Sequence, residues 1–180
     1  TFADGMRIEA SRVVVATDVS SMKRLLPASK LEEPRWRSVT NLYFAAEASP
    51  INEAIICLNG EGRGLVNNVC VLTDASPHYS ADGRPLLLVS VLGLPEVEDL
   101  PGAVKRELRH WFGEEVGGWE HLRTDRIARG LPEQLPGASD GSGFSECEGV
   151  YICGDHFMSA SIEGAVISGK KVAEAIGLQK

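Results

Sequence analysis

The sequence of 180 residues lacks the features that would place it in a membrane or on a nucleic acid. Its longest apolar run, residues 86–94, falls well short of the roughly 18–20 residues that a membrane-spanning helix needs. Acidic residues outnumber basic ones by 25 to 18, and the two signs are interspersed, so no basic surface for a nucleic acid is predicted. The net charge of −7 is interpreted as an aid to solubility.

Cysteine is scarce and its spacing is uninformative. None of the four cysteines forms a CxxC pair, and no histidine lies at a metal-ligand spacing from them, so no metal site is predicted. Three of the four lie in apolar, strand-like runs, and buried, reduced thiols are expected. Reduced thiols fit a reducing compartment, so a cytoplasmic location is predicted. The cysteines are Cys57, Cys70, Cys147 and Cys153.

The dinucleotide-binding fingerprint is also missing. The glycine-rich stretch at 60–64, GEGRG, has Leu65 where the fingerprint needs a third glycine. A strand-like run follows it, whereas a phosphate loop opens a helix whose dipole attracts the phosphate. We therefore predict a hairpin turn here, since glycine is a standard turn residue.

The N-terminal part predicts a strand, a turn and a short helix. Residues 12–16, RVVVA, are typical of a strand buried on both faces, and Asp18 is a suitable N-cap for a helix that Pro27 ends. Asp4-Gly5 predicts a hairpin turn that places residues 7–9 in a strand before 13–15. The chain would then open inside a sheet, as expected of a piece of a longer protein.

The central part predicts an antiparallel sheet with one helix. Four strand-like runs fall within residues 36–93, with turn residues between them. An amphipathic helix is expected at about 102–112, ended by Gly113, and a further strand-like run at 119–127. A loop rich in Pro, Gly and Ser, residues 130–148, then leads back to an apolar strand at 150–153.

The last helix should begin at Ser161, which is a suitable N-cap, and end at Gly177. One continuous helical face is predicted to pack on a sheet, with Gly169 allowing close approach. Gly164 in the first turn costs roughly 0.5–1 kcal/mol relative to alanine, which a close neighbour would justify. The face consists of Ile162, Ala165, Val166, Gly169, Val172, Ala173 and Ile176.

Two features at this end could bind a ligand. Free backbone N–H groups at a helix start without bulky side chains suit an anion or an electron-rich carbonyl. Gly154-Asp155 follows the strand at 150–153, and ligands of open α/β sheets bind beyond the carboxyl ends of strands. Asp155 could accept hydrogen bonds from sugar-like hydroxyls, or it could be a turn residue. His156 beside it is interpreted as an exposed loop residue.

The stretches GVYICGD (149–155) and SIEGAVISGKKVAEAI (161–176) resemble the C-terminal FAD-binding element of the flavin-containing amine oxidase superfamily, and most of all its phytoene-desaturase-like branch. The resemblance implies FAD as the cofactor. It places Asp155 near the ribityl-pyrophosphate and the helix start at the pyrimidine edge of the flavin. It names no catalytic side chain and no metal ligand. The implied cofactor-binding residues are Gly154, Asp155, Ser161, Ile162, Glu163, Gly164, Ala165 and Val166.

The resemblance also implies the fold and the substrate class. The expected class is α+β, with a partial α/β FAD-binding domain (residues 1–33 and 136–180) and an inserted antiparallel-sheet substrate domain (34–135). Amine oxidases proper carry an aromatic residue where this chain has Ser161, which favours the desaturase-like branch and a bulky, hydrophobic small molecule. Its oxidation would proceed by hydride transfer to the flavin.

Two further interpretations stay open at this point. The glycine-rich unit that holds the ADP part of FAD in this family is absent, so the chain is expected to be inactive by itself. It could instead be a non-catalytic, truncated or split module that self-associates or pairs with a chain carrying the missing half. A lipid or polyene carrier would leave the start of the last helix unexplained. Carotenoid-like chemistry would imply a plastid location or contact with a membrane surface.

Overall fold

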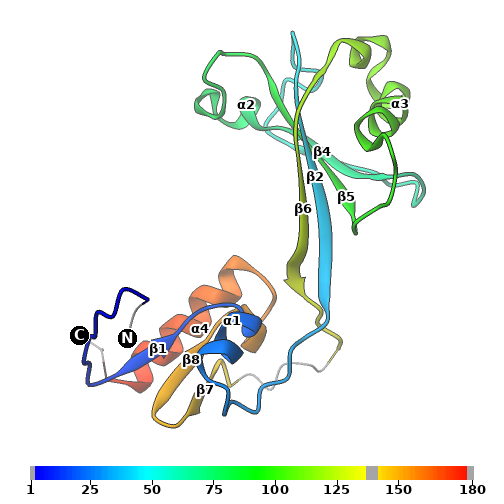
Figure 1. Cartoon of the computed structure of the whole chain (residues 1–180). Coiled ribbons are helices and arrows are strands. Elements are labelled where there is room, and N and C mark those ends of the chain that lie inside the picture. The colour runs from blue at the N-terminus through cyan, green and yellow to red at the C-terminus, as the bar shows by residue number, and fades with distance from the viewer. Residues whose placement is uncertain (1–2, 137–141, 178–180) are drawn as a thin grey trace. The chain divides into compact units, whose positions relative to one another are not determined.

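The computed structural model describes residues 3–136 and 142–177, and the chain divides into two compact units (Figure 1). The first, here called the terminal unit, contains Thr1–Trp36 and Leu131–Lys180. The second, here called the central unit, contains Arg37–Gly130. The sequence placed these boundaries after residues 33 and 135.

The terminal unit has a mixed sheet with helices beside it. In the part of the chain that the structure describes, the strand order is β1-β8-β7, with β1 parallel and β7 antiparallel to β8. Helix α4 packs against β7, β8 and the turn that follows β8. The elements are β1 (Val13–Val15), α1 (Val19–Leu25), β7 (Phe144–Cys147), β8 (Val150–Cys153), the 3₁₀ turn η3 (Asp155–Phe157) and α4 (Ile162–Ala175).

A small apolar core holds the terminal unit together. Met22 of α1 and Ile152 of β8 are fully buried in it. Asp18 caps α1 as predicted, because its Oδ1 accepts a hydrogen bond from the Ser21 amide at 3.0 Å. The helix ends at Leu25, two residues before Pro27.

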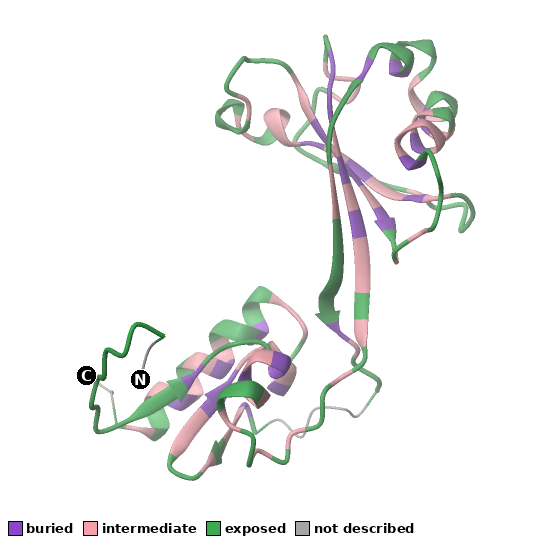
Figure 2. Ribbon diagram, viewed as in Figure 1, coloured by how far each residue is buried: buried purple, intermediate pink, exposed green. Residues whose placement is uncertain are grey.

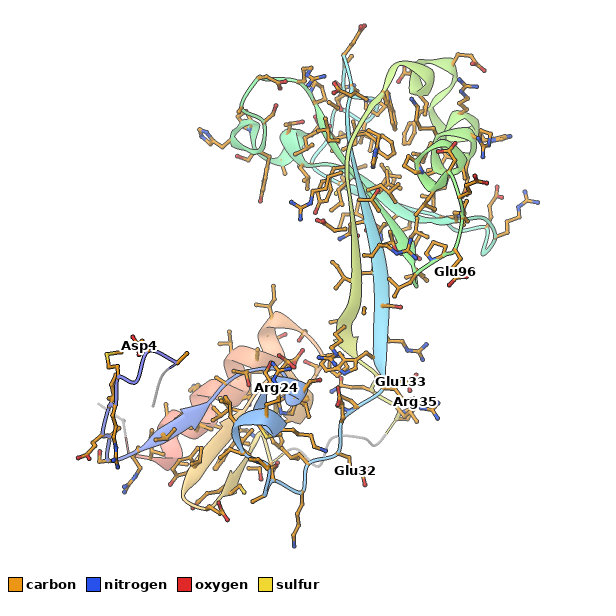
Figure 3. All side chains as sticks on the ribbon, viewed as in Figure 1. Asp4, Arg24, Glu32, Arg35, Glu96 and Glu133 are labelled. Atoms are coloured by element: carbon orange, nitrogen blue, oxygen red, sulfur yellow. The ribbon has the colours of Figure 1, made fainter. Side chains whose placement is uncertain are left out.

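Two predictions for the N-terminus are wrong. Residues 7–9 form no strand, although Asp4, labelled in Figure 3, lies in a turn as expected. The strand at 13–15 is not buried on both faces, since Val13 is 47% and Val14 40% exposed. The reason is that β1 lies at the edge of the sheet, paired with β8 alone among the described residues. A β-branched run reports strand propensity but not the strand's place in the sheet.

The predicted loop at 130–148 is also wrong in part, because it contains β7 and the end of β6. Strand β7 pairs with β8 in a hairpin whose two turn residues, Glu148 and Gly149, both have positive φ values of 51° and 79°. Two adjacent residues with positive φ are the mark of the type I′ turn that matches strand twist. The prediction missed this hairpin because glutamate is an unusual first turn residue.

The central unit contains the predicted antiparallel sheet, with strand order β3-β4-β5-β2-β6 in the described residues. Figure 2 shows buried positions along β2, β4 and β5. Short helical turns connect the elements. The bounds are β2 (Trp36–Ala45), β3 (Ile56–Leu58), β4 (Val66–Val71), α2 (Leu72–Ala75), η1 (Pro77–Tyr79), β5 (Leu86–Leu92), α3 (Leu100–Phe112), η2 (Glu114–Gly118) and β6 (Glu120–Pro132).

One face of this sheet forms the core of the central unit. Leu42, Val89 and Val69 form a row across β2, β5 and β4, and all three are fully buried. Helix α3 covers this face with Val104 and Leu108, as its predicted amphipathic pattern requires. The antiparallel sheet together with the mixed sheet confirms the α+β class.

Among the described residues, no helix has the length and apolar character needed to cross a membrane.

Candidate functional site

The candidate site lies where β8 ends in the terminal unit. Strands β1 and β8 are parallel neighbours, so their carboxyl ends meet at one edge of the sheet. Asp18 follows β1 there, and Asp155 follows β8 at the start of η3. This edge is where open α/β sheets bind ligands. The carboxylate of Asp155 remains partly exposed, whereas that of Asp18 is engaged in capping α1.

A buried serine of α4 fixes the turn that carries Asp155. The Ser168 hydroxyl accepts a hydrogen bond from the Gly154 amide at 2.8 Å and donates one to the Gly143 carbonyl. Ser168 is fully buried, so both of its hydrogen bonds are shielded from water. The helix, the end of β8 and the segment before β7 are thereby joined at one point. The sequence pattern predicts no role for Ser168.

His156 was predicted to be exposed, and this prediction is wrong, since its side chain is only 10% exposed. The ring lies against Phe157, with 4.4 Å between ring centroids. Its Nδ1 lies 3.9 Å from Asp155 Oδ1, and Nε2 is buried without a hydrogen-bond partner among the described residues. Burial lowers the pKa of His156, while the charges of Asp155 and Asp18 oppose that effect. A β-carbon on Gly154 would meet the His156 ring at 2.5 Å, so the glycine makes room for it.

Helix α4 begins as predicted at Ser161, whose hydroxyl accepts a hydrogen bond from the Gly164 amide at 3.0 Å. The Ala165 amide makes the first intrahelical bond, to the Ser161 carbonyl at 3.0 Å. The amides of Ile162 and Glu163 have no hydrogen-bond partner in the described part of the chain. Two unpaired donors thus stand at the positive end of the helix dipole.

Gly164 has the close neighbour that was predicted for a glycine in the first turn of the helix. A β-carbon at this position would lie 1.9 Å from the backbone carbonyl oxygen of Ser159. The close neighbour is therefore the loop before the helix, and Gly164 is buried against it. The prediction that Gly169 allows close approach of the helix to the sheet is wrong, because a β-carbon there would meet nothing within 4 Å.

The predicted packing face of α4 is wrong at its N-terminal end. Ile162 is 88% and Val166 65% exposed, and Ala165 is exposed as well. The buried positions are Gly164, Ser168 and Val172, which recur every four residues, and of these only Val172 belongs to the predicted face. Ile162, Ala165 and Val166 therefore form an exposed surface at the start of the helix, here called the open face of α4.

A pocket of about 490 Å³ adjoins η3 within the terminal unit. It is lined by Val19, by residues 31–34 and 132–134, and by His156 and Phe157. Its walls combine apolar side chains with the carboxyl groups of Glu32, Glu33 and Glu133. Figure 3 labels Glu32 and Glu133 on the two segments that border it. The described residues contain no cluster of His, Cys, Asp or Glu that could hold a metal ion.

The glycine-rich stretch of the central unit is the predicted hairpin connection, between β3 and β4. Asn59 closes it with hydrogen bonds from Nδ2 to the carbonyls of Arg63 and Val66, both at 2.8 Å. The carboxylate of Glu107, on α3, accepts from the Leu65 amide at 2.7 Å and the Val66 amide at 3.1 Å. The amides at the end of this loop are thus engaged within the protein rather than free for a phosphate.

The four cysteines are all free thiols. Only Cys153 is buried, so the prediction of burial is correct there and too strong for the other three. Burial raises the pKa of both Cys153 and Cys70, which keeps these thiols protonated.

Comparisons with known proteins identify the family of the chain. The sequence matches the family described as flavin containing amine oxidoreductase over residues 1–177, nearly its whole length. The chain therefore belongs to the flavin-containing amine oxidoreductase family, whose cofactor is a flavin. The resemblance identified from the sequence is confirmed at this level. No curated protein matches the chain.

Two solved structures share the fold. An oxidoreductase from Methanosarcina mazei superposes with a TM-score of 0.71 at 18% identity, covering 93% of this chain and 43% of its own. A protein from Pyrococcus furiosus gives a TM-score of 0.66 at 13% identity, covering 99% of this chain and 43% of its own. The chain thus spans less than half the length of either protein.

The residues present fit the isoalloxazine end of a flavin. The pyrimidine edge of this ring carries carbonyl oxygens, and the two unpaired amides of Ile162 and Glu163 are suitable donors for them. The exposed apolar side chains of Ile162 and Val166 lie in the same first turns of the helix as these amides. The structure places both groups of predicted residues on neighbouring elements, because η3, which carries Asp155, packs against α4. The Gly154 amide bonds to Ser168, farther along the helix, and not to residues 161–166.

Proposed function

We propose that the terminal unit holds the flavin end of FAD in an oxidoreductase that acts on a hydrophobic small molecule. The observation that carries the proposal is the start of α4, where the amides of Ile162 and Glu163 have no hydrogen-bond partner in the described residues. Ser161, Ile162, Glu163, Gly164, Ala165 and Val166 would form the contact surface for the ring. Gly154 and Asp155 would meet the ribityl-pyrophosphate.

The flavin would supply the chemistry of a two-electron acceptor, taking a hydride from the substrate. The role of this chain's own residues is electrostatic and steric. The amides of Ile162 and Glu163 would stabilise negative charge on the pyrimidine edge, aided by the helix dipole. The exposed apolar side chains of Ile162 and Val166 would exclude water from the ring.

A hydrophobic substrate is supported by the second face of the central sheet. The strand register aligns Tyr43, Leu88, Cys70 and Ile56 in one row across β2, β5, β4 and β3. These residues are partly buried or exposed, and they lie on the face opposite the core that α3 covers. Such a row is a suitable apolar wall for a substrate pocket. We therefore assign the central unit as the substrate domain.

The experiment that tests the proposal is an absorption spectrum of the purified chain. The protein is incubated with FAD, desalted and scanned through the visible range, with free FAD passed through the same column as control. Retained flavin absorbance in proportion to protein is expected. A colourless protein would contradict flavin binding by this chain alone, and would favour the second candidate below.

The second candidate is a module that needs a partner chain, and the edge of β1 favours it. Parallel strands are normally covered on both faces and flanked on both sides, whereas Val13 and Val14 are half exposed. An open strand edge is a template for pairing with another chain. The partner would supply the glycine-rich half that holds the ADP part of FAD, or would be a second copy.

Self-association through β1 can be measured directly. Light scattering coupled to size exclusion should show dimers or larger species for the wild-type chain, and Val14→Lys should shift the chain toward monomer, because an inserted charge blocks edge pairing. Equal masses for the two proteins would contradict pairing of copies through this edge. A monomer that binds FAD would remove the reason to propose a partner.

A further inference from the structure

The side chain of Gln134 makes two hydrogen bonds to the backbone of the loop before α4. Its Nε2 donates a hydrogen bond to the Met158 carbonyl at 2.6 Å, and its Oε1 accepts one from the Ala160 amide at 2.7 Å. Gln134 thus pairs with the loop through both ends of one planar amide. Two hydrogen bonds of this kind fix both the orientation of the loop and its distance from Gln134.

The backbone beside Gln134 is itself anchored. The Glu133 amide donates to the Arg35 carbonyl at 2.7 Å, which joins the segment after β6 to the segment before β2. Figure 3 shows the labelled side chains of Arg35 and Glu133 at this point. The backbone from which the Gln134 side chain extends is therefore anchored by a hydrogen bond of the preceding residue.

Further hydrogen bonds connect this loop to the start of α4. The Ser161 amide donates to the Ser159 carbonyl at 2.7 Å, and the hydroxyls of these two serines lie 2.8 Å apart. The same Ser159 carbonyl lies against Gly164, and Ser161 caps α4 through the Gly164 amide. A displacement of Ser159 or Ala160 would therefore disturb the cap and the first turn of the helix.

We propose that Gln134 is a positioning residue for the cofactor end of the terminal unit. It orders residues 158–161, and through them the N-cap that aims the unpaired amides of Ile162 and Glu163. The identity of the ligand that these amides would meet rests on the proposed function. The ordering of the helix start by Gln134 does not depend on that identity.

Glutamine is the residue that this geometry requires. Glutamate keeps the length and can accept from Ala160, but a carboxylate cannot donate to the Met158 carbonyl. Leucine keeps much of the volume and makes neither bond. Gln134→Leu and Gln134→Glu therefore remove two and one of the hydrogen bonds, respectively.

The test is residue-resolved amide exchange by NMR on the full chain. In Gln134→Leu, the amides of Ala160, Gly164 and Ala165 should all exchange about fivefold faster, as expected for the loss of modest hydrogen bonds. In Gln134→Glu, the Gly164 and Ala165 amides should still exchange faster than in wild type. The Ile152 amide in β8 should be unchanged, which shows that the fold is intact.

A matched control is Asn59→Asp, which also replaces an amide by a carboxylate. It removes the donors to Arg63 and Val66 inside the central unit. It should leave the exchange of Ala160, Gly164 and Ala165 at wild-type rates. Acceleration at Ala160 alone, or at none of the three, in Gln134→Leu would overturn the proposal.

A flavin titration adds a readout that a purely local contact would not change. Where wild type and Asn59→Asp bind FAD, Gln134→Leu should bind it several-fold more weakly and shift the flavin absorbance maxima. Identical affinity and spectra would overturn the role toward the cofactor. If even wild type binds no FAD, the proposed function fails for the chain alone, and the amide exchange still decides the role of Gln134.

Discussion

The backbone carbonyl oxygen of Ser159 lies 1.9 Å from the position that a β-carbon on Gly164 would occupy. The loop and the first turn of α4 can approach this closely only because residue 164 has no side chain. The contact explains a glycine in a helical turn where glycine is otherwise unfavourable. The second glycine of α4, Gly169, has no such neighbour, so a side chain should be tolerated at residue 169 but not at residue 164.

Gly164→Ala should destabilise the terminal unit, because the new methyl group meets backbone that has no easy way to move. The expected loss in free energy of unfolding is about 1–3 kcal/mol, typical of overpacking. Gly169→Ala is the matched control, since its methyl group meets nothing within 4 Å. It should stabilise the helix by roughly 0.5–1 kcal/mol. Urea denaturation followed by circular dichroism measures both, and changes of the same sign would contradict this account.

The stability of the terminal unit should fall in mild acid because of His156. Burial lowers the pKa of His156 in the folded chain, so the unfolded chain binds a proton more readily. The contribution of His156 is then complete above the unfolded pKa of about 6.5 and is lost as the pH falls through it toward the folded pKa.

Unfolding free energies of wild type and His156→Phe at pH 7.5 and pH 5.0 test this dependence. Wild type should lose more stability than the variant between the two pH values. The exposed His78 of the central unit, replaced by phenylalanine, serves as control. Parallel losses in wild type and His156→Phe would show that His156 carries no part of the pH dependence.

Glu107 should be a main stabiliser of the connection between β3 and β4. Its carboxylate accepts from two consecutive amides, those of Leu65 and Val66. In Glu107→Gln only one of the two side-chain atoms is an oxygen acceptor, so one backbone N–H faces the NH₂ group. The free energy of unfolding of the central unit should fall by roughly 1–3 kcal/mol. Glu98→Gln makes the same charge change at an exposed position and should have little effect. Equal thermal midpoints for the two variants would contradict the assigned role.

Much of the fold could be predicted from local patterns. The caps at Asp18 and Ser161, the glycine at 113 and the strands of the central unit follow from residue type and spacing. The burial of β1 could not be predicted, because a run of three valines looks alike at the edge and in the middle of a sheet. Strand β7 was missed because its apolar pattern is short and its turn begins with Glu148.

The candidate site was predictable in its position but not in its contacts. The strand followed by Gly154-Asp155 and the small residues after Ser161 indicate a ligand-binding position from residue type and order alone. The contacts of the site depend on segments that are far apart in the sequence. They include the burial of His156, the hydrogen bonds of Ser168 and those of Gln134 to the loop before α4. The helical period of α4 predicted one continuous apolar face, but the buried positions include Gly164 and Ser168, which lie outside that face, because the period cannot say which neighbour covers the helix.

The central claim is that the amides at the start of α4 hold a flavin, and a pair of substitutions at Ile162 tests it most directly. Ile162 is the first helical residue, where proline is well tolerated, and Ser161 before it has the extended backbone that proline requires. Ile162→Pro therefore removes one unpaired N–H and leaves the helix in place. Ile162→Ala trims the side chain and keeps the N–H.

The measurement is the dissociation constant for FAD, taken from the quenching of flavin fluorescence. Ile162→Ala measures the effect of losing the side chain alone, and Ile162→Pro should bind FAD about three- to tenfold more weakly than Ile162→Ala, as for one lost hydrogen bond. An Ile162→Pro protein that binds FAD as tightly as Ile162→Ala would contradict the claim.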